Sequence, residues 1–135
     1  MITYTDSLHG ITADKLNGFF LGWPNPPKPD AHLRILQGSS HFVLAVDNQT
    51  GQIVGFINAV SDGVLNAFIP LLEVLPSHQH HGIGAELVKQ MLAKLRNLYA
   101  IDLLCDADLQ PFYERFGMRP YTAMLYRNYD RQSGH

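Results

Sequence analysis

The stretch PSHQHHGIGAEL, residues 76–87, holds three histidines and two glycines and carries the most distinctive pattern of the chain. The residues before it, NAFIPLLEVL, are almost continuously apolar, as in a central strand covered on both faces. After it, apolar residues recur with helical spacing as far as Leu95, which predicts an amphipathic helix of about four turns. The stretch is therefore predicted to be a glycine-rich turn between a buried strand and a long helix.

Three familiar kinds of site fit this turn poorly. The histidines His78, His80 and His81 have no thiolate or carboxylate neighbours at metal-site spacing, so a metal site is not favoured. A P-loop requires Lys and then Ser or Thr after its second glycine, and here Ala and Glu follow instead. A dinucleotide-binding fingerprint lacks its third glycine, because Leu87 occupies that place.

Two interpretations of the turn remain open, a plain strand-to-helix connection and an anion site. A glycine-rich turn that opens a long helix leaves unpaired N–H groups pointing to one place. The helix dipole favours negative charge at the same place. A ligand that carries phosphate is therefore the sharper expectation.

The composition is that of an ordinary globular chain. The 135 residues predict one compact domain, 1–135, and 46% hydrophobic with 16% charged residues excludes a disordered chain. A formal charge of -2 without a basic run predicts no nucleic-acid partner, and no apolar run is long enough for a membrane span. The N-terminus lacks the regions of a signal peptide, and Cys105 is the single cysteine, so we expect a cytoplasmic protein. The oligomeric state stays open, and a homodimer is one option.

Turn residues and hydrophobic periodicity divide the chain into strands and helices. The NQTG turn at 48–51 separates two β-rich runs, which predicts a hairpin. Four prolines within residues 22–30 predict a stiff loop, with Asp30 capping the next helix. The predicted strands are 2–5, 41–47, 52–62, 66–75, 101–105 and 122–129, and the predicted helices are 12–20, 30–38, 82–95 and 109–116. This order predicts an α/β sheet whose first part is antiparallel.

Residues 72–85, LEVLPSHQHHGIGA, resemble the coenzyme A signature of the GCN5-related N-acetyltransferases, in which Gln79, Gly82 and Gly84 match the core pattern. A second motif of the family is similar to residues 105–118, CDADLQPFYERFGM. The likeness is closest to the small-amine, arylalkylamine-like branch. The resemblance implies a mixed sheet that is splayed between its fourth and fifth strands and flanked by helices. It also implies acetyl-coenzyme A as cosubstrate, without a metal.

The same resemblance implies which residues bind the cosubstrate. The pyrophosphate is expected on main-chain amides of the turn, and the pantetheine along the edge of the strand before it. The expected coenzyme A-binding residues are Leu72, Glu73, Val74, Gln79, His80, His81, Gly82, Ile83, Gly84 and Ala85.

The resemblance implies direct attack of a primary amine on the thioester, through a tetrahedral intermediate. The main-chain N–H of Leu72 is expected to polarise the acetyl carbonyl. The family places its general acid at Tyr113. Helical spacing agrees, because Phe112 and Phe116 share one face and Tyr113 is offset from them by one residue. A phenol stays protonated at neutral pH, so it can donate to the departing thiolate.

The sequence leaves the proton acceptor open. The arylalkylamine branch uses imidazoles at positions that align with Phe68 and Pro70, and neither side chain can take a proton. Glu73 is the nearest carboxylate and can act through water, with an outward, solvated side chain as the alternative. Asp62 is a weaker candidate. Cys105 lies in an apolar run and is interpreted as a core residue rather than a nucleophile.

The proline-rich loop is expected to border the acceptor site, in keeping with the family. Trp23 and the prolines can form the floor of an apolar pocket, or a rigid cover over the core. A small-molecule amine is favoured as acceptor. Acetylation of a protein N-terminus or lysine, and a non-catalytic acyl-coenzyme A sensor, stay open as alternatives. A sensor would not need a general acid at Tyr113.

Overall fold

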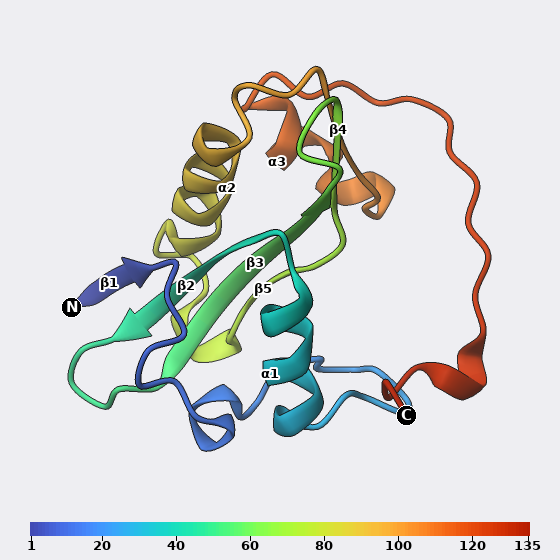
Figure 1. Cartoon of the computed structure of the whole chain (residues 1–135). Helices are drawn as coiled ribbons and strands as arrows, with labels where there is room; N and C mark the ends of the chain where they lie inside the picture. Colours follow the sequence, from blue (N-terminus) through green and yellow to red (C-terminus); the bar gives the residue numbers. More distant parts are fainter.

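A six-stranded mixed sheet forms the centre of the protein, and the computed structural model describes all residues from Met1 to His135 (Figure 1). Neighbouring strands of the sheet follow the order β1-β2-β3-β4-β6, and β5 pairs with β3 outside this path. The strands are β1 (Ile2–Thr5), β2 (His41–Asp47), β3 (Ile53–Ser61), β4 (Asn66–Ile69), β5 (Leu72–Val74) and β6 (Ala100–Leu103). The helices are α1 (Pro29–Gly38), α2 (Ile83–Lys94) and α3 (Gln110–Glu114), with 3-10 turns η1 (Ala13–Leu16), η2 (Pro76–His78), η3 (Ala107–Leu109) and η4 (Tyr129–Arg131). The predicted α/β architecture is confirmed.

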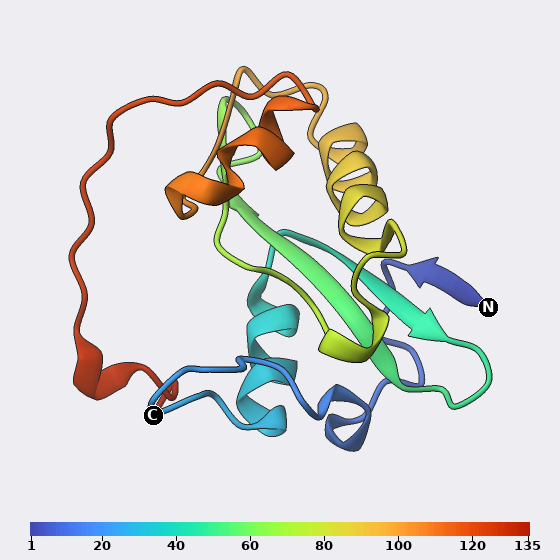
Figure 2. The ribbon, with the colours of Figure 1, turned by 180° about the vertical axis from the view of Figure 1, so that it is seen from behind.

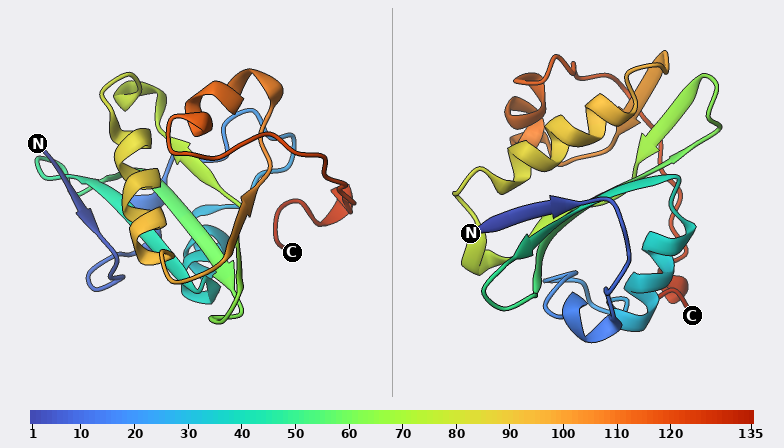
Figure 3. Two further views of the ribbon diagram at one scale, coloured as in Figure 1. Left: turned by 90° about the horizontal axis from the view of Figure 1, so that it is seen from above. Right: turned by 60° about the vertical axis from the view of Figure 1, so that its left-hand side comes forward.

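Helices cover both faces of the sheet, as Figures 2 and 3 show. On one face, Leu87 and Met91 of α2 pack onto the sheet, and the aromatic side chains of α3 join the same core. On the other face, Leu16 of η1 and Leu36 of α1 pack around Phe56. The central strand β3 is therefore buried on both faces from its first to its seventh residue, which explains its nearly unbroken apolar sequence.

The helix α2 lies very close to β3 at Gly55. A Cβ atom at this position would lie 3.1 Å from Cγ2 of Ile83 and 3.2 Å from Cδ1 of Leu87. A side chain at position 55 would force these side chains to shift by a few tenths of an ångström, so glycine allows the close approach at no such cost. The contact fixes the first turn of α2, and with it the preceding glycine loop, against β3.

The apolar run 66–75, predicted as one strand, forms two strands that are interrupted at Pro70 and Leu71. Asn58 of β3 bonds to the interruption twice: its main-chain N–H donates to the Leu71 carbonyl at 3.2 Å, and its side-chain Oδ1 accepts the Leu71 N–H at 3.1 Å. The Asn58 amide nitrogen donates in turn to Ser39 Oγ at 3.0 Å. Asn58 is 2% exposed, so the sheet core holds this break through a buried polar network.

The break opens the sheet between β5 and β6. β4 pairs in parallel with β6 as far as Ile69 and Leu103, whereas β5 pairs with β3 alone. The chain after Pro70 therefore diverges from β6. The predicted splay between the two strand regions is confirmed, and its edges are β5 and the end of β6.

Three predicted helix boundaries differ from the structure. The helix predicted at 12–20 is the single turn η1, because the backbone is already extended at Asn17. α1 begins at Pro29 with Lys28 as its N-cap residue, not at Asp30, since proline suits the first helical position. The helix predicted at 109–116 is only α3, and η3 precedes it.

The predicted last strand, 122–129, does not form within the chain. Residues 118–127 make no main-chain hydrogen bond to other main-chain groups, and residues 119–131 are exposed. Residues 118–128, here called the arm, run from the end of α3 around the outside of the molecule (Figure 1). The main-chain N–H of Asn25 donates to Gln132 Oε1 at 2.8 Å and so holds the chain after the arm near α1. The arm therefore joins no sheet within one chain.

No helix of the structure combines the length and apolar character that a membrane crossing requires.

His32 on α1 is a buried histidine without a hydrogen-bond partner. It is 1% exposed, and neither ring nitrogen has an acceptor or donor nearby. Its ring packs against Phe19, Phe20 and Phe56, at a centroid distance of 4.3 Å from Phe56. Burial lowers the pKa of His32 to about 4, because the charged ring would lose its hydration.

We predict that His32 makes stability depend on pH. The pKa of His32 in the folded chain lies below the ordinary value of 6.5. Between these two pKa values His32 is protonated in the unfolded chain and neutral in the folded chain. The stabilisation is therefore present above about pH 6.5 and is lost as the pH falls to about 4, by about 3 kcal/mol. His32→Leu should flatten this part of the profile in urea denaturation. The exposed His9→Leu is the control, and an unchanged slope in His32→Leu would contradict the assignment.

Candidate functional site

The loop that enters α2 presents a row of unused main-chain donors. The N–H groups of His80 through Ala85 donate to no acceptor within the protein, and the first main-chain bond of the helix is from Glu86 N–H to the Gly82 carbonyl. Two left-handed residues shape the row, His80 at φ 67° and Gly82 at φ 82°. Such consecutive N–H groups at a helix N-terminus form a site for an anion.

Side-chain contacts hold this loop in place. Gln79 Nε2 donates to the Val74 carbonyl at 3.0 Å, which ties the loop to the end of β5. His78 Nε2 lies 3.3 Å from Asp47 Oδ2 and so contacts the β2–β3 hairpin. His80 and His81 are exposed. The structure contains no group of three His, Cys, Asp or Glu side chains that could hold a metal ion.

β5 offers a free main-chain edge to the splayed cleft. The Leu75 N–H donates to the Val54 carbonyl, and the Leu71 carbonyl accepts the Asn58 N–H, so both residues face β3. Successive residues of a strand point their main-chain groups to opposite edges. The N–H groups of Leu72 and Val74 therefore face away from β3, toward β6, whereas the main chain of Glu73 faces β3.

A pocket of about 500 Å³ lies in the splay between β5 and β6. It brings together residues that are distant in sequence: the loop after η1, β5, the end of β6, α3 and the arm. Its lining residues include Phe20, Trp23, Leu72, Glu73, Leu103, Cys105, Tyr113, Leu125 and Arg127. The three expected catalytic residues, Leu72, Glu73 and Tyr113, thus line one pocket.

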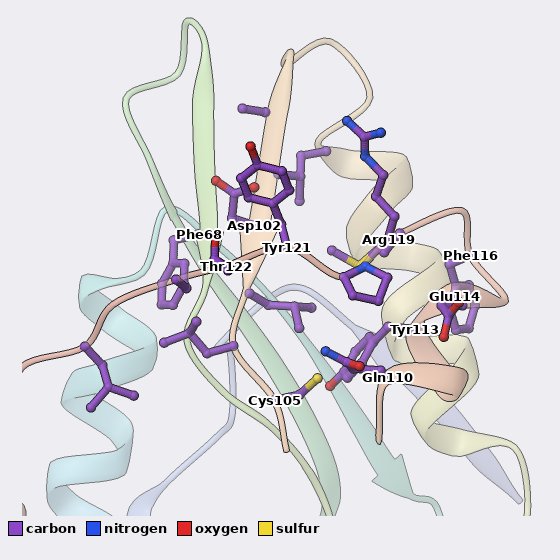
Figure 4. Close-up of a pocket in the computed structure, with 18 of the residues that line it drawn as sticks. Phe68, Asp102, Cys105, Gln110, Tyr113, Glu114, Phe116, Arg119, Tyr121 and Thr122 are labelled. Carbon is purple, nitrogen blue, oxygen red and sulfur yellow. The ribbon is translucent and has the colours of Figure 1, made fainter. Parts of the chain in front are cut away.

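Tyr113 lies on α3 beside the end of β6, and Figure 4 shows it close to Cys105. Its ring packs edge-on against Phe112 at a centroid distance of 5.0 Å, and Phe112 packs against Phe116. Burial raises the pKa of the Tyr113 hydroxyl, and the nearby Cys105 raises it further. The hydroxyl therefore stays protonated at neutral pH and can donate a proton.

Cys105 lines the pocket but is poorly suited to act as a nucleophile. Burial raises the pKa of its thiol, and the carboxylates of Asp106 and Asp108 raise it further. A thiol with a raised pKa carries little thiolate at neutral pH. The prediction that Cys105 is a core residue within a strand is wrong, because it lies beyond the end of β6, is only half-buried and lines the pocket. Its lack of a nucleophilic function remains a prediction.

The carboxylate of Glu73 is not free in solvent. Its Oε1 accepts the Phe20 N–H at 2.8 Å and its Oε2 accepts the Leu21 N–H at 3.4 Å. Phe20 has a left-handed backbone, with φ 62°. Glu73 therefore joins β5 to the loop that carries Trp23 and stabilises a turn that is costly for a phenylalanine.

Asp62 is remote from this pocket. Its carboxylate accepts the N–H groups of Val64, Leu65 and Asn66 in the turn between β3 and β4. These bonds hold the pKa of Asp62 well below its usual range. Asp62 is therefore a turn residue. Phe68 lies on β4 and, as an apolar side chain, offers no proton acceptor.

Sequence reasoning missed two contributors to the site. Asn58, which holds the splay open, lies inside an apolar strand, and its polarity at a buried position was the only available signal. Arg127 reaches the pocket from the arm, and no local pattern could place it there.

The comparison with protein families agrees with the geometry. The model of the acetyltransferase (GNAT) family matches residues 9–118. The chain belongs to this family. The match covers the glycine loop, the splayed strands and α3.

Curated relatives of the chain carry the same family description. A chloroplastic GCN5-related N-acetyltransferase 3 from Arabidopsis thaliana is 45% identical over 69 residues, which are 50% of this chain and 29% of that protein. An uncharacterized N-acetyltransferase from Pyropia yezoensis is 28% identical over 72% of this chain and 58% of its own length. The chain thus spans well under two thirds of these curated relatives.

Solved structures of GNAT proteins have the same fold. A candidate acetyltransferase from Deinococcus radiodurans is 48% identical, with a TM-score of 0.95, and the match covers 98% of this chain and 92% of that one. A GNAT family acetyltransferase from Streptococcus pneumoniae is 29% identical, with a TM-score of 0.74 over 95% of this chain and 98% of that one.

We predict that Glu73→Ala destabilises the protein by about 1–3 kcal/mol, because two main-chain N–H groups lose a charged acceptor. Glu73→Gln should cost less, since an amide oxygen can still accept the Phe20 N–H. Denaturant unfolding provides the measurement, and Glu114→Ala, which removes an exposed carboxylate on α3, is the control. Equal stability of Glu73→Ala and wild type would show that the link is not formed.

Proposed function

We propose that the protein is an acetyl-coenzyme A-dependent N-acetyltransferase that acts on a small primary amine. The observation that carries the proposal is the row of unused main-chain donors from His80 to Ala85 at the start of α2. Family membership supports the same cosubstrate. Residues 1–135 would then form one acetyltransferase domain.

The donor row fits the pyrophosphate of the cosubstrate. Two phosphate charges need several N–H donors, and the helix dipole adds to the attraction. The side chain of Gln79 supports the row by holding the loop on β5. Gly82 leaves open space around the donors, since a Cβ there would have no protein atom within 4 Å.

The free edge of β5 fits the pantetheine arm. Pantetheine carries amide groups that can pair with a strand edge as an added strand does. The main-chain groups of Leu72 and the N–H of Val74 supply this pairing, because the Val74 carbonyl already accepts from Gln79 Nε2. The side chain of Glu73 lines the same pocket. The Leu72 N–H is the donor that we assign to the developing oxyanion.

In the proposed reaction, the nitrogen lone pair of the amine attacks the thioester carbonyl, a C–N bond forms and the C–S bond breaks. The hydroxyl of Tyr113 gives its proton to the departing sulfur, which leaves as the thiol of coenzyme A. The attacking nitrogen loses one proton, so that the amide product is neutral. Glu73 lines the pocket and accepts this proton through water. No covalent intermediate with the protein is formed, which agrees with the raised pKa of Cys105.

The apolar lining of the pocket supports a small acceptor. Phe20, Trp23 and Leu125 contribute apolar walls, which suit an amine with an apolar or aromatic body, as in the arylalkylamine-like branch. Acetylation of a protein N-terminus or lysine is the second candidate, and a silent acyl-coenzyme A sensor is the third.

The remaining expectations concern partners and location. We propose a protein that acts on its amine without nucleic acid, membrane or metal. The cytoplasm is the proposed compartment, because a single cysteine suits a reducing environment.

We predict that Gly82→Ala weakens acetyl-coenzyme A binding about tenfold or more. The new Cβ would hold a phosphate away from the N–H groups, and one charge-assisted bond is worth about 1.5–3 kcal/mol. Gly10→Ala is the matched control, because Gly10 also has a left-handed φ, 76° against 82°, and open space around it. Calorimetry measures both affinities. If the two variants bound equally well, the phosphate site would be misplaced.

We predict that Tyr113→Phe lowers turnover about 10²-fold while acetyl-coenzyme A affinity stays within about twofold. The ring packing against Phe112 is kept and only the proton donor is lost. A thioester-consumption assay over a panel of amines first identifies an acceptor and then measures the loss. Tyr99→Phe, an exposed tyrosine, is the control. Turnover within about threefold of wild type would argue against the general acid and favour a sensor or another catalytic route.

A further inference from the structure

His32 is the one buried side chain of the structure whose polar atoms have no hydrogen-bond partner. Both nitrogens of its ring are unpaired, although the residue is only 1% exposed. The reaction proposed above does not use these nitrogens. A buried polar group without a partner is costly, so the ring is a candidate to bind a hydrogen-bonding group that reaches it.

Two phenylalanine rings lie both against His32 and against the pocket between β5 and β6, here called the acceptor pocket. The His32 ring has centroid distances of 5.0 Å to the Phe20 ring and 4.3 Å to the Phe56 ring. Phe20 and Phe56 also line the acceptor pocket, whereas His32 does not. His32 therefore lies directly behind the pocket wall. Phe56 belongs to the central strand β3, so Phe20, which lies in a loop, is the ring that can move aside.

The loop segment that carries Phe20 is suited to move. This segment, residues 18–22 with the sequence GFFLG, begins and ends with glycine. Both glycines have a left-handed backbone, with φ 93° at Gly18 and φ 85° at Gly22. A single main-chain hydrogen bond holds the GFFLG segment, from the Trp23 N–H to the Phe20 carbonyl at 3.2 Å. Small residues at both ends and few main-chain bonds are features of loops that open and close over a site.

Opposing forces act on the closed position of Phe20. Its φ of 62° is unfavourable for a phenylalanine. The burial of its ring, which is 3% exposed, favours the closed position. The carboxylate of Glu73 does so as well, because it accepts the Phe20 N–H at 2.8 Å and the Leu21 N–H at 3.4 Å. A ligand that competes for this carboxylate would therefore release the strain at Phe20 and uncover His32 in one movement.

A primary ammonium group matches the two polar groups that flank Phe20. It is cationic and has three N–H donors, whereas Glu73 offers a carboxylate and His32 offers a ring nitrogen that accepts a hydrogen bond. Burial lowers the pKa of His32 to about 4, so its ring is neutral at physiological pH and does not repel a cation. The neighbouring walls of the pocket are apolar, which suits the hydrocarbon body of an amine.

We propose that the GFFLG segment is a gate over a concealed amine-binding site, in which Glu73 and His32 bind the ammonium group of the acceptor once Phe20 has moved aside. The reaction requires the neutral amine, so the concealed site captures the acceptor and is not the place of attack. The identity of the ligand as the acceptor rests on the proposed function, whereas the gate itself does not.

The test titrates the protein with butylamine in the absence of acetyl-coenzyme A. Butan-1-ol is the control for the apolar body, and sodium chloride is the control for ionic strength. Trp23, the single tryptophan, reports on the gate through its fluorescence, because it packs against Phe20 at a centroid distance of 5.0 Å. NMR of the ¹⁵N-labelled ring nitrogens reports on His32. Butylamine is expected to change both signals with one common Kd, and the two controls are expected to change neither.

Variants separate the concealed site from a general effect of the amine. His32→Leu keeps an apolar side chain in the core and should lower the affinity for butylamine about tenfold, whereas His32→Gln keeps a hydrogen-bond acceptor and should lose less. Glu73→Gln should lower the affinity about tenfold or more, because the amide carries no charge. Glu114→Gln changes an exposed carboxylate on α3 and is the control, with the affinity of the wild type.

The outcomes distinguish the gate from the activity. No binding of butylamine, unchanged His32 signals on binding, or wild-type affinity in His32→Leu would each overturn the proposal. Should His32→Leu fail to fold, the His32 signals of the wild type decide. Acetylation is assayed separately over a panel of amines. A His32 response to butylamine without acetylation of any amine would overturn the proposed function alone, and acetylation without this response would overturn the gate alone.

Discussion

The two hydrogen bonds between Asn58 and Leu71 are the constraint on which the rest of the site depends. They hold the main chain at a point where Pro70 cannot donate to the sheet, and the Asn58 side chain that makes them is buried. A buried amide with all its partners is stable, whereas one that lost them would be costly. The break therefore has a fixed place. β4 can remain with β6 and β5 can leave it, and the cleft follows.

The glycine loop and the cleft are positioned by the same core. The close approach of α2 to Gly55 fixes the first turn of the helix against β3, and Gln79 ties the loop to the end of β5. The unused N–H groups of the loop and the free edge of β5 therefore meet at one end of the cleft. A cosubstrate with a pyrophosphate and an amide-bearing arm fits this continuous line of donors.

Glu73 and the arm both contribute walls to the cleft. Glu73 holds the left-handed turn at Phe20, which brings Trp23 to the pocket. The arm brings Leu125 and Arg127, although it belongs to no sheet of its own chain. The walls of the pocket are thus made by segments that are distant in sequence.

The sequence by itself determined the hairpin, the helix that follows the glycine loop and the family motifs, because periodicity and turn residues act locally. It also placed Tyr113 relative to Phe112 and Phe116, since helical spacing is fixed. Only the tertiary structure decided that the apolar run 66–75 is interrupted, because a buried side chain from another strand holds the interruption. The absence of a strand at 122–129 was likewise decided by the tertiary structure. The pattern of these residues is typical of a strand, but a strand forms only when its main chain pairs with another strand.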